Sequence, residues 1–224
     1  MKKIIFSVVL AGVSMAASAN ATSSNAARWL RDVQISPDGK HVLFNAAIQQ
    51  QSHSMVFPTG AQPQVYKVAV SGGRPVQILG TPAEAICFTP DGKQMLYQDR
   101  KGFEDEFRKH HTSSVTRDIW LYDTKTATHK NLTSRGGEDR NPVLSPDGKT
   151  VYFLSERNGG SFNVYSFPID NAAAVSAVTT HTSHPVRFLS VSKDGTLCYA
   201  YDGDIYVRKA GEKSKKNHGK IPGM

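Results

Sequence analysis

Apolar and polar positions along this chain follow a pattern that returns about every fifty residues. A polar turn motif, Ser-Pro-Asp-Gly-Lys from Ser36, recurs as Thr-Pro-Asp-Gly-Lys from Thr89 and as Ser-Pro-Asp-Gly-Lys from Ser145. A weaker copy, Ser-Lys-Asp-Gly-Thr, begins at Ser192. The four starts are 53, 56 and 47 residues apart, a spacing regular enough to indicate a repeat architecture.

Each copy of the motif predicts a tight turn between two strands. Proline fixes φ at the first central position, aspartate tolerates the second, and glycine accepts the left-handed conformation that follows. Apolar-rich segments precede the turns. Strand-forming segments follow them at residues 41–44, 94–97, 151–154 and 197–200. A third segment with a central aromatic recurs at 64–68, 118–122, 163–167 and 204–207. A shorter fourth segment closes only the first three repeats, at 75–79, 129–133 and 175–179.

Four short strands in each repeat are typical of a β-propeller blade. A β-helix would need a shorter period, and an immunoglobulin sandwich would not repeat the turn four times. The predicted fold is therefore all-β, a partial β-propeller of four antiparallel four-stranded blades, with the aromatics of the third strands in the core between sheets. The blades are expected at residues 28–80, 81–134, 135–180 and 181–207, the last one incomplete because it lacks its outer strand.

The first 21 residues have the order of features found in a secretory signal peptide. Lys2 and Lys3 precede an apolar stretch at residues 4–17, and small residues at 17–21 offer cleavage after Ala19 or Ala21. The apolar stretch is shorter than the roughly 20 residues of a spanning helix, which disfavours a membrane anchor. We therefore expect a periplasmic or secreted protein with no membrane span in the mature chain.

The formal net charge of +8 is concentrated at the two ends of the chain. Residues 22–207 hold 19 basic and 18 acidic side chains, so the body lacks the charge pattern of a nucleic-acid binder. Residues 208–224 form a basic, Gly-containing stretch without strand periodicity, and we predict a disordered tail there. Cys87 and Cys198 lie in repeats that are not adjacent, so two unpaired, buried thiols are expected rather than a disulfide.

The connection before the third strand of the second repeat is the candidate ligand loop. It carries Arg108, His110, His111 and Arg117, which we predict to contact a substrate or partner, because propeller loops carry the binding that these folds perform. His110 and His111 stand near two serines, but neighbours in one loop do not form a catalytic dyad without a third orienting group. We predict no catalytic residue, no cofactor and no metal site, since the histidines have no metal-ligand spacing.

The turn motif, the strands that follow it, and the Asp-Ile-Trp and Asp-Ile-Tyr segments resemble WD40-like repeats of TolB and of tricorn-type proteases. Three further segments, 108–118, 138–142 and 161–165, are similar to the propeller of tricorn-like serine peptidases from Bacteroides-type bacteria. The resemblance covers residues 29–207 and implies a propeller that admits or selects peptides. The family's further blades and catalytic domain are not recognisable here, so a frame shift or premature stop in a longer gene is our hypothesis.

Two classes of function remain open from the sequence. The first is a non-catalytic, substrate-gating or binding propeller of a secreted tricorn-like serine protease, in which case this chain alone is not an enzyme. The second is a free-standing TolB-like periplasmic propeller that binds a protein. The propeller of a prolyl-oligopeptidase-like enzyme is a weaker third. In each case the partner would be a peptide or protein at the channel or loops, and we expect the chain either to be unstable alone or to complete a ring with another chain.

Overall fold

The computed structural model describes residues 30–46, 63–101, 107, 115–159 and 161–217. Their strands form four sheets of four strands. Blade 1 contains β1 (Leu30–Ile35), β2 (His41–Ala46), β3 (Gln64–Ala69) and β4 (Val76–Gln77). Blade 2 contains β5 (Ala83–Phe88), β6 (Gln94–Asp99), β7 (Ile119–Asp123) and β8 (Thr128–Asn131). Blade 3 contains β9 (Asp139–Leu144), β10 (Thr150–Ser155), β11 (Asn163–Pro168) and β12 (Ser176–Ala177). Blade 4 contains β13 (Arg187–Val191), β14 (Leu197–Tyr201), β15 (Asp204–Arg208) and β16 (Lys215–Lys216).

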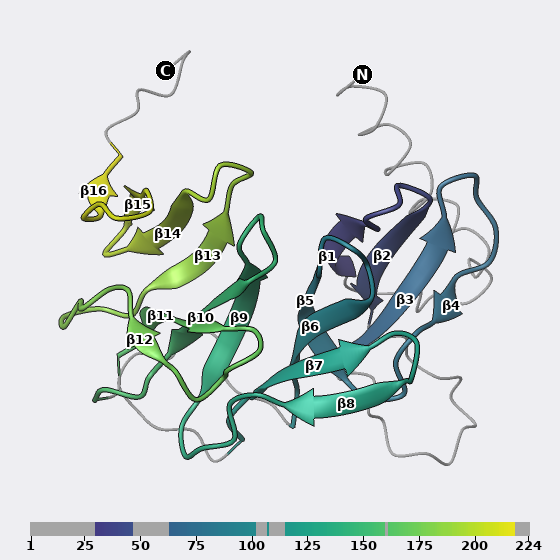
Figure 1. Cartoon of the computed structure of the whole chain (residues 1–224), viewed down its shortest axis with the longest axis horizontal. Coiled ribbons are helices and arrows are strands. Elements are labelled where there is room, and N and C mark those ends of the chain that lie inside the picture. The colour runs from purple at the N-terminus through teal and green to yellow at the C-terminus, as the bar shows by residue number, and fades with distance from the viewer. Residues whose placement is uncertain (1–29, 47–62, 102–106, 108–114, 160, 218–224) are drawn as a thin grey trace.

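Within every blade the strands pair antiparallel in chain order, from the first strand at the centre to the fourth at the periphery. The blades stand around a common centre, as Figure 1 shows. Neighbouring blades contact each other through their first strands, β1 with β5, β5 with β9, and β9 with β13. This arrangement confirms the predicted all-β propeller of four four-stranded blades.

The prediction that the last blade lacks its outer strand is wrong. Lys215 and Lys216 form β16, which pairs with β15 through Tyr206 and Val207, and the amide of Asn217 donates to the carbonyl of Ile205. The outer strands β4 and β12 are equally short and exposed, so this position needs no apolar residue and leaves no hydrophobic signal. The stretch predicted to be disordered from residue 208 is therefore paired as far as residue 217.

The turn motif works as a hydrogen-bonded unit. In the first copy the Ser36 hydroxyl donates to Asp38 Oδ1 at 2.5 Å and accepts from the His41 amide at 2.9 Å. Asp38 Oδ1 also accepts from the Lys40 amide at 3.0 Å. The hydroxyl and this amide hold the pKa of the Asp38 carboxyl below its usual range. The copies at Thr89 and Ser145 repeat these bonds, which explains why the motif needs Ser or Thr first and Asp third.

The turns also contact one another from blade to blade. The proline of one turn lies against the glycine of the next, Pro37 against Gly92 and Pro90 against Gly148. A Cβ placed on Gly148 would be only 2.7 Å from Pro90 Cδ, closer than real atoms approach. All these motif glycines have positive φ, between 68° and 81°. Glycine is thus required for its left-handed conformation at every turn and for close packing at Gly148 as well.

A second feature recurs four residues before each turn. At this position every inner strand has a β-bulge with a left-handed, non-glycine residue, with φ of 51° at Asp32, 49° at Ala85, 53° at Asn141 and 55° at Phe188. This conformation is unfavourable for alanine and phenylalanine by roughly 1–2 kcal/mol each. Bulges bend a strand and redirect its side chains. Here they turn the inner strands toward the centre of the propeller.

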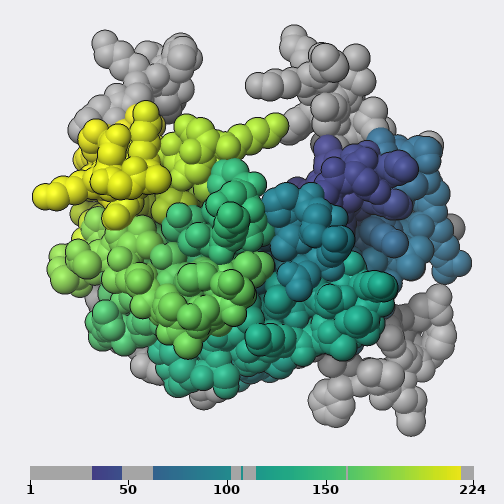
Figure 2. Space-filling model, viewed as in Figure 1, coloured from purple at the N-terminus to yellow at the C-terminus, as the bar shows by residue number. Residues whose placement is uncertain are grey.

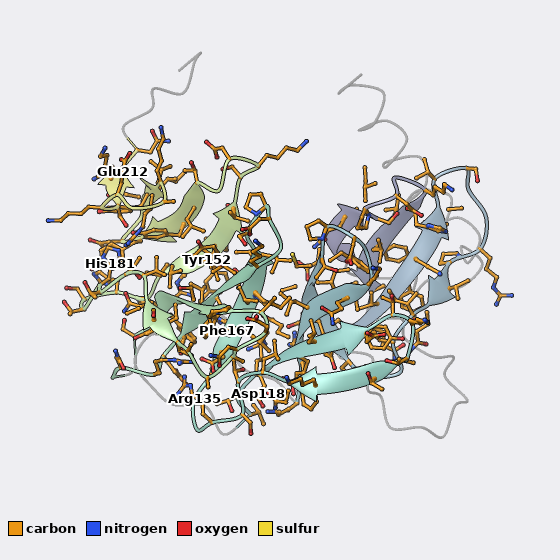
Figure 3. All side chains as sticks on the ribbon, viewed as in Figure 1. Asp118, Arg135, Tyr152, Phe167, His181 and Glu212 are labelled. Carbon is orange, nitrogen blue, oxygen red and sulfur yellow. The ribbon has the colours of Figure 1, made fainter. Side chains whose placement is uncertain are left out.

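The hydrophobic core consists of three clusters between adjacent blades and a fourth within blade 1. One cluster joins blades 1 and 2, another joins blades 2 and 3, and a third joins blades 3 and 4. In blade 3 the rings of Phe153 and Phe167 lie 5.1 Å apart, and Phe167 can be located in Figure 3. Three of the aromatics at the centre of the third strands lie in the clusters between blades or pack against them, as predicted: Trp120, Tyr165 and Tyr206. Tyr66 packs against the cluster within blade 1 instead.

Candidate functional site

A hollow of about 260 Å³ lies where the inner strands of the four blades converge. All four bulge residues line it, together with Phe107 from the connection between β6 and β7. The remaining wall is mostly polar or charged and comprises Glu84, Gln98, Arg117, Arg140, Leu154 and Arg187. Loops and strand ends at the centre of a propeller are where its ligands bind, so this hollow is the candidate site.

Hydrogen bonds between blades fix the wall of the hollow. The Ala85 amide of blade 2 donates to Asp32 Oδ2 of blade 1 at 2.8 Å. The Asn141 amide of blade 3 donates to Gln98 Oε1 of blade 2 at 2.6 Å, and its side-chain amide donates to the Leu189 carbonyl of blade 4 at 3.2 Å. The bulges therefore bend the inner strands, and bulge residues also form hydrogen bonds between blades.

Phe107 brings the predicted ligand loop to the hollow. Although it belongs to blade 2, it contacts two residues of blade 4. Arg187 Nη2 donates to the Phe107 carbonyl at 2.8 Å, and its guanidinium lies 5.1 Å from the Phe107 ring centroid. The Phe107 and Phe188 rings are 6.4 Å apart, and both side chains are largely exposed. An aromatic pair and a guanidinium therefore stand together at the hollow, a combination suited to apolar side chains beside carbonyl or carboxylate oxygens.

Arg117, one of the four predicted loop residues, lines the hollow but is only 2% exposed. Its Nη1 donates to Glu138 Oε1 at 2.7 Å, and its Nε lies 3.4 Å from Glu84 Oε2. Arg140 approaches the same Glu138 oxygen at 3.7 Å. Because Glu84 belongs to blade 2 and Glu138 to blade 3, Arg117 joins two blades through a buried ion-pair network.

The charges in this network control the ionisation of Glu84. Burial raises the pKa of its carboxyl, but Arg100 and Arg117 outweigh the burial and hold the pKa below its ordinary value. Gln98 Nε2 also donates to Glu84 Oε2 at 3.0 Å. Glu84 is therefore a carboxylate at neutral pH, and the arginines around it balance its charge. It holds no proton to donate as a general acid.

Arg108, His110 and His111 lie outside the described residues. At the rim where blades 2 and 3 meet, Lys101 donates to Asp118, which is labelled in Figure 3, at 2.7 Å.

The described part of the chain brings no three His, Cys, Asp or Glu side chains together as metal ligands. Cys87 and Cys198 are unpaired, as predicted, although each is only half-buried. The described residues contain no helix of the length and hydrophobicity needed to cross a membrane.

The fold is that of a β-propeller with a hollow at its centre. The sequence matches the tricorn protease N-terminal beta propeller domain family over residues 48–214, and the chain belongs to this family. Its propeller character and its likeness to tricorn-type repeats, expected from the turn motif, are thereby established.

Individual relatives give the same picture. The chain is 42% identical over 76 residues to dipeptidyl-peptidase 5 of Porphyromonas endodontalis, an alignment covering 33% of this chain and 10% of the relative. It is 27% identical over 180 residues to an uncharacterized protein of Agrobacterium fabrum, covering 78% of this chain and 52% of that protein. A putative TolB from Agrobacterium tumefaciens has the same fold, with a TM-score of 0.63 at 22% identity, covering 85% of this chain and 65% of the other. The chain thus spans about half or less of the length of these two curated relatives.

Sequence reasoning missed Phe107, Arg187 and the bulge residues. The bulges do have a signal, because each one lies four residues before a turn motif. The residue types there, Asp, Ala, Asn and Phe, share no chemistry, so only the spacing could have revealed them. Arg187 directly precedes the last bulge and could have been found by the same rule.

Proposed function

We propose that this chain is a non-catalytic, substrate-gating or binding propeller of a secreted tricorn-like serine protease. One observation carries the proposal: the central hollow takes wall residues from all four blades, among them Phe107 and Arg117 of the predicted ligand loop. The ligand is a peptide segment whose apolar side chain packs against the exposed Phe107 and Phe188 pair while Arg187 binds its carbonyl or carboxylate oxygens. Regional similarity to a dipeptidyl-peptidase supports peptides as the ligand class.

The binding test uses two fluorescein-labelled peptides that differ only in a central residue, phenylalanine or glycine. Fluorescence anisotropy should show tighter binding of the phenylalanine peptide by the full chain. Phe107→Ala should weaken it about tenfold, since an aromatic pair contributes about 0.5–1.5 kcal/mol beyond area burial. Val76→Ala is the matched control, because Val76 is an exposed apolar residue on the outer strand β4. Equal affinity of the two peptides, or of Phe107→Ala and the parent, would overturn the proposal.

The second candidate is a TolB-like periplasmic propeller that docks a protein partner. The similarity of its blades to those of a TolB structure favours it, although at 22% identity that likeness establishes the fold alone. This candidate requires no peptide in the hollow. Absence of binding by both labelled peptides would therefore favour it over the gating function.

We also propose that residues 1–21, which lie outside the described residues, direct export to the periplasm. Ala19 belongs to both small-residue cleavage motifs, so Ala19→Lys should block processing at either position and leave the full-length precursor. Ser18→Lys is the matched control, because this residue stands between the small positions of the first motif and outside the second. Intact mass of the protein from periplasmic and cytoplasmic fractions gives the result. Identical processing of the Ala19→Lys variant and the parent would count against an export signal.

A further inference from the structure

Two backbone amides of an inner strand can hold it to the preceding blade. The first amide lies two residues before the bulge and donates to a carbonyl of the preceding blade at 2.8–3.0 Å. This bond recurs at all three interfaces between blades, with Ala83, Asp139 and Val186 as the donors. The second amide is that of the bulge residue. At the first two interfaces, where the donors are Ala85 and Asn141, it donates to a side-chain oxygen of the preceding blade.

The third interface, between blades 3 and 4, keeps the first of these bonds and lacks the second. Val186 donates to the Phe162 carbonyl at 2.8 Å, so the inner strand of blade 4 is seated on its predecessor in the same way as the others. The bulge residue Phe188 has a φ of 55°, close to the 49° of Ala85 and the 53° of Asn141. In the described part of the chain, however, no side-chain oxygen accepts a hydrogen bond from the Phe188 amide.

One residue of blade 3 explains the difference. Leu154 occupies the repeat position of Gln98, because each pairs with the residue that directly precedes the bulge in its own blade. Gln98 supplies the acceptor at the second interface, whereas leucine has none to supply. The nearby Asn141 side chain donates its amide to the Leu189 carbonyl instead. Blade 3, which would have to provide the acceptor, lies directly against blade 4 (Figure 2).

The bulge of blade 4 lies at the proposed peptide site. Leu154 and Phe188 both line the central hollow, and the Phe188 ring is one half of the exposed aromatic pair. A backbone N–H is a strong hydrogen-bond donor, and folded proteins pair such groups almost completely wherever water is excluded. A peptide ligand brings a main-chain carbonyl with each of its residues. It therefore carries the kind of acceptor that the third interface lacks.

We propose that the Phe188 amide donates to a main-chain carbonyl of the bound peptide, at the place where a side-chain oxygen accepts in the other two interfaces. The inference rests on the proposed function, because this carbonyl belongs to the peptide whose apolar side chain packs against Phe107 and Phe188. The two contacts recognise different parts of the ligand. The aromatic pair selects the side chain, while the amide fixes the position of the main chain whatever the sequence of the peptide.

Hydrogen exchange of the full chain, followed at single amides by NMR, tests the donor. In the absence of peptide, the Phe188 amide should exchange at least about tenfold faster than the Asn141 amide, because only the second has an acceptor. Val186 is the matched reference, since its amide is bonded across the same interface as Phe188. The phenylalanine peptide should slow exchange at Phe188 and leave Val186 unchanged. Equal protection of Phe188 and Asn141 without peptide, or no slowing at Phe188 with it, would overturn the proposal.

A variant that supplies the missing acceptor tests the contact from the side of the protein. Leu154→Gln places a side-chain oxygen where Gln98 has one, so the Phe188 amide should become protected without any ligand. The phenylalanine peptide should then bind about fivefold more weakly than to Leu154→Met, which keeps the position apolar, because a hydrogen bond between neutral groups contributes about that factor to an affinity. Circular dichroism checks that both variants keep their sheet content.

A change in the ligand tests the same contact from the other side. In a series of phenylalanine peptides, one carbonyl at a time is replaced by a carbon–carbon double bond of the same shape. One of these replacements should weaken binding to Leu154→Met about fivefold and have no effect on binding to Leu154→Gln, whose Phe188 amide is already occupied.

Failure of this proposal and failure of the proposed function give different results. If the phenylalanine peptide is preferred over the glycine peptide, but Leu154→Gln and Leu154→Met bind it equally and no carbonyl matters, the peptide site stands and its contact with the Phe188 amide is overturned. If neither peptide binds, both proposals are overturned.

Discussion

Replacing Arg117 by alanine should lower the free energy of unfolding by roughly 3–5 kcal/mol, as measured by urea denaturation at pH 7. The guanidinium is almost wholly buried and lies between Glu84 and Glu138, so its loss leaves two carboxylates of two blades facing each other without their shared cation. Arg74→Ala is the matched control, because Arg74 is exposed in the loop before β4. If both variants cost the same, the buried network does not hold blades 2 and 3 together.

The effect of Arg117→Ala should also depend on pH. In the folded chain the pKa of Glu84 lies below its ordinary value of 4.5, so its contribution is complete above that pH and is lost as the pH falls through the folded pKa. Without Arg117 the pKa of the Glu84 carboxyl should rise, because only Arg100 is left to oppose the effect of burial. The difference between variant and parent should therefore shrink on acidification. A triple variant, Glu84→Gln with Arg117→Met and Glu138→Gln, should recover part of the lost stability, because neutral amides then replace the two carboxylates that Arg117 neutralises.

Replacing Gly148 by alanine should cost roughly 2–5 kcal/mol, again in urea denaturation. Part of the cost comes from a φ of 74°, which disfavours any residue with a Cβ by about 1–2 kcal/mol. The rest comes from the 2.7 Å approach of the new Cβ to Pro90 Cδ, an overpacking effect of about 1–3 kcal/mol. Gly39→Ala is the matched control, because Gly39 has a similar φ of 70° and no atom within 4 Å of the position of a Cβ.

The contact with Pro90 can be isolated by a double-mutant cycle. Pro90→Ala removes the atoms that the new Cβ would meet, so the double variant should be more stable than the sum of the two single changes predicts. Strict additivity, or an equal cost for Gly39→Ala and Gly148→Ala, would mean that the packing of turns between blades contributes nothing. The measurement thus separates the two reasons for glycine in this motif.

Much of the fold could be predicted because its strongest determinants are local. The turn motif encodes its own hydrogen bonds, and the strands beside it carry apolar residues that neighbouring blades bury. The outer strand β16 could not be predicted, because Lys215 and Lys216 are exposed and are held by backbone bonds to β15 and by the ion pair of Lys216 with Asp204 at 2.5 Å. A strand at the edge of a sheet needs no hydrophobic pattern.

The candidate site was less predictable, because it depends on which blades face each other. The sequence drew attention to the loop before β7, and Phe107 of this loop does lie at the hollow. Nothing in the sequence indicates that it would contact Arg187, eighty residues further along the chain. Arg117 could be identified as part of the loop. Its buried ion pairs could not, because they depend on the fold bringing Glu84 of blade 2 and Glu138 of blade 3 together.

The pairing of strands strictly in chain order has a consequence for synthesis on the ribosome. Each strand finds its partner within the segment that has just emerged, so no blade waits for residues made much later. The longest connections within a blade, residues 47–63 and 100–118, are still local in sequence, and local pairing favours rapid formation of each sheet. The hydrophobic clusters, however, lie between blades, so a nascent blade remains exposed until its successor appears. The segment most exposed to misfolding or proteolysis during synthesis is therefore about one repeat long, and its position advances along the chain as translation proceeds.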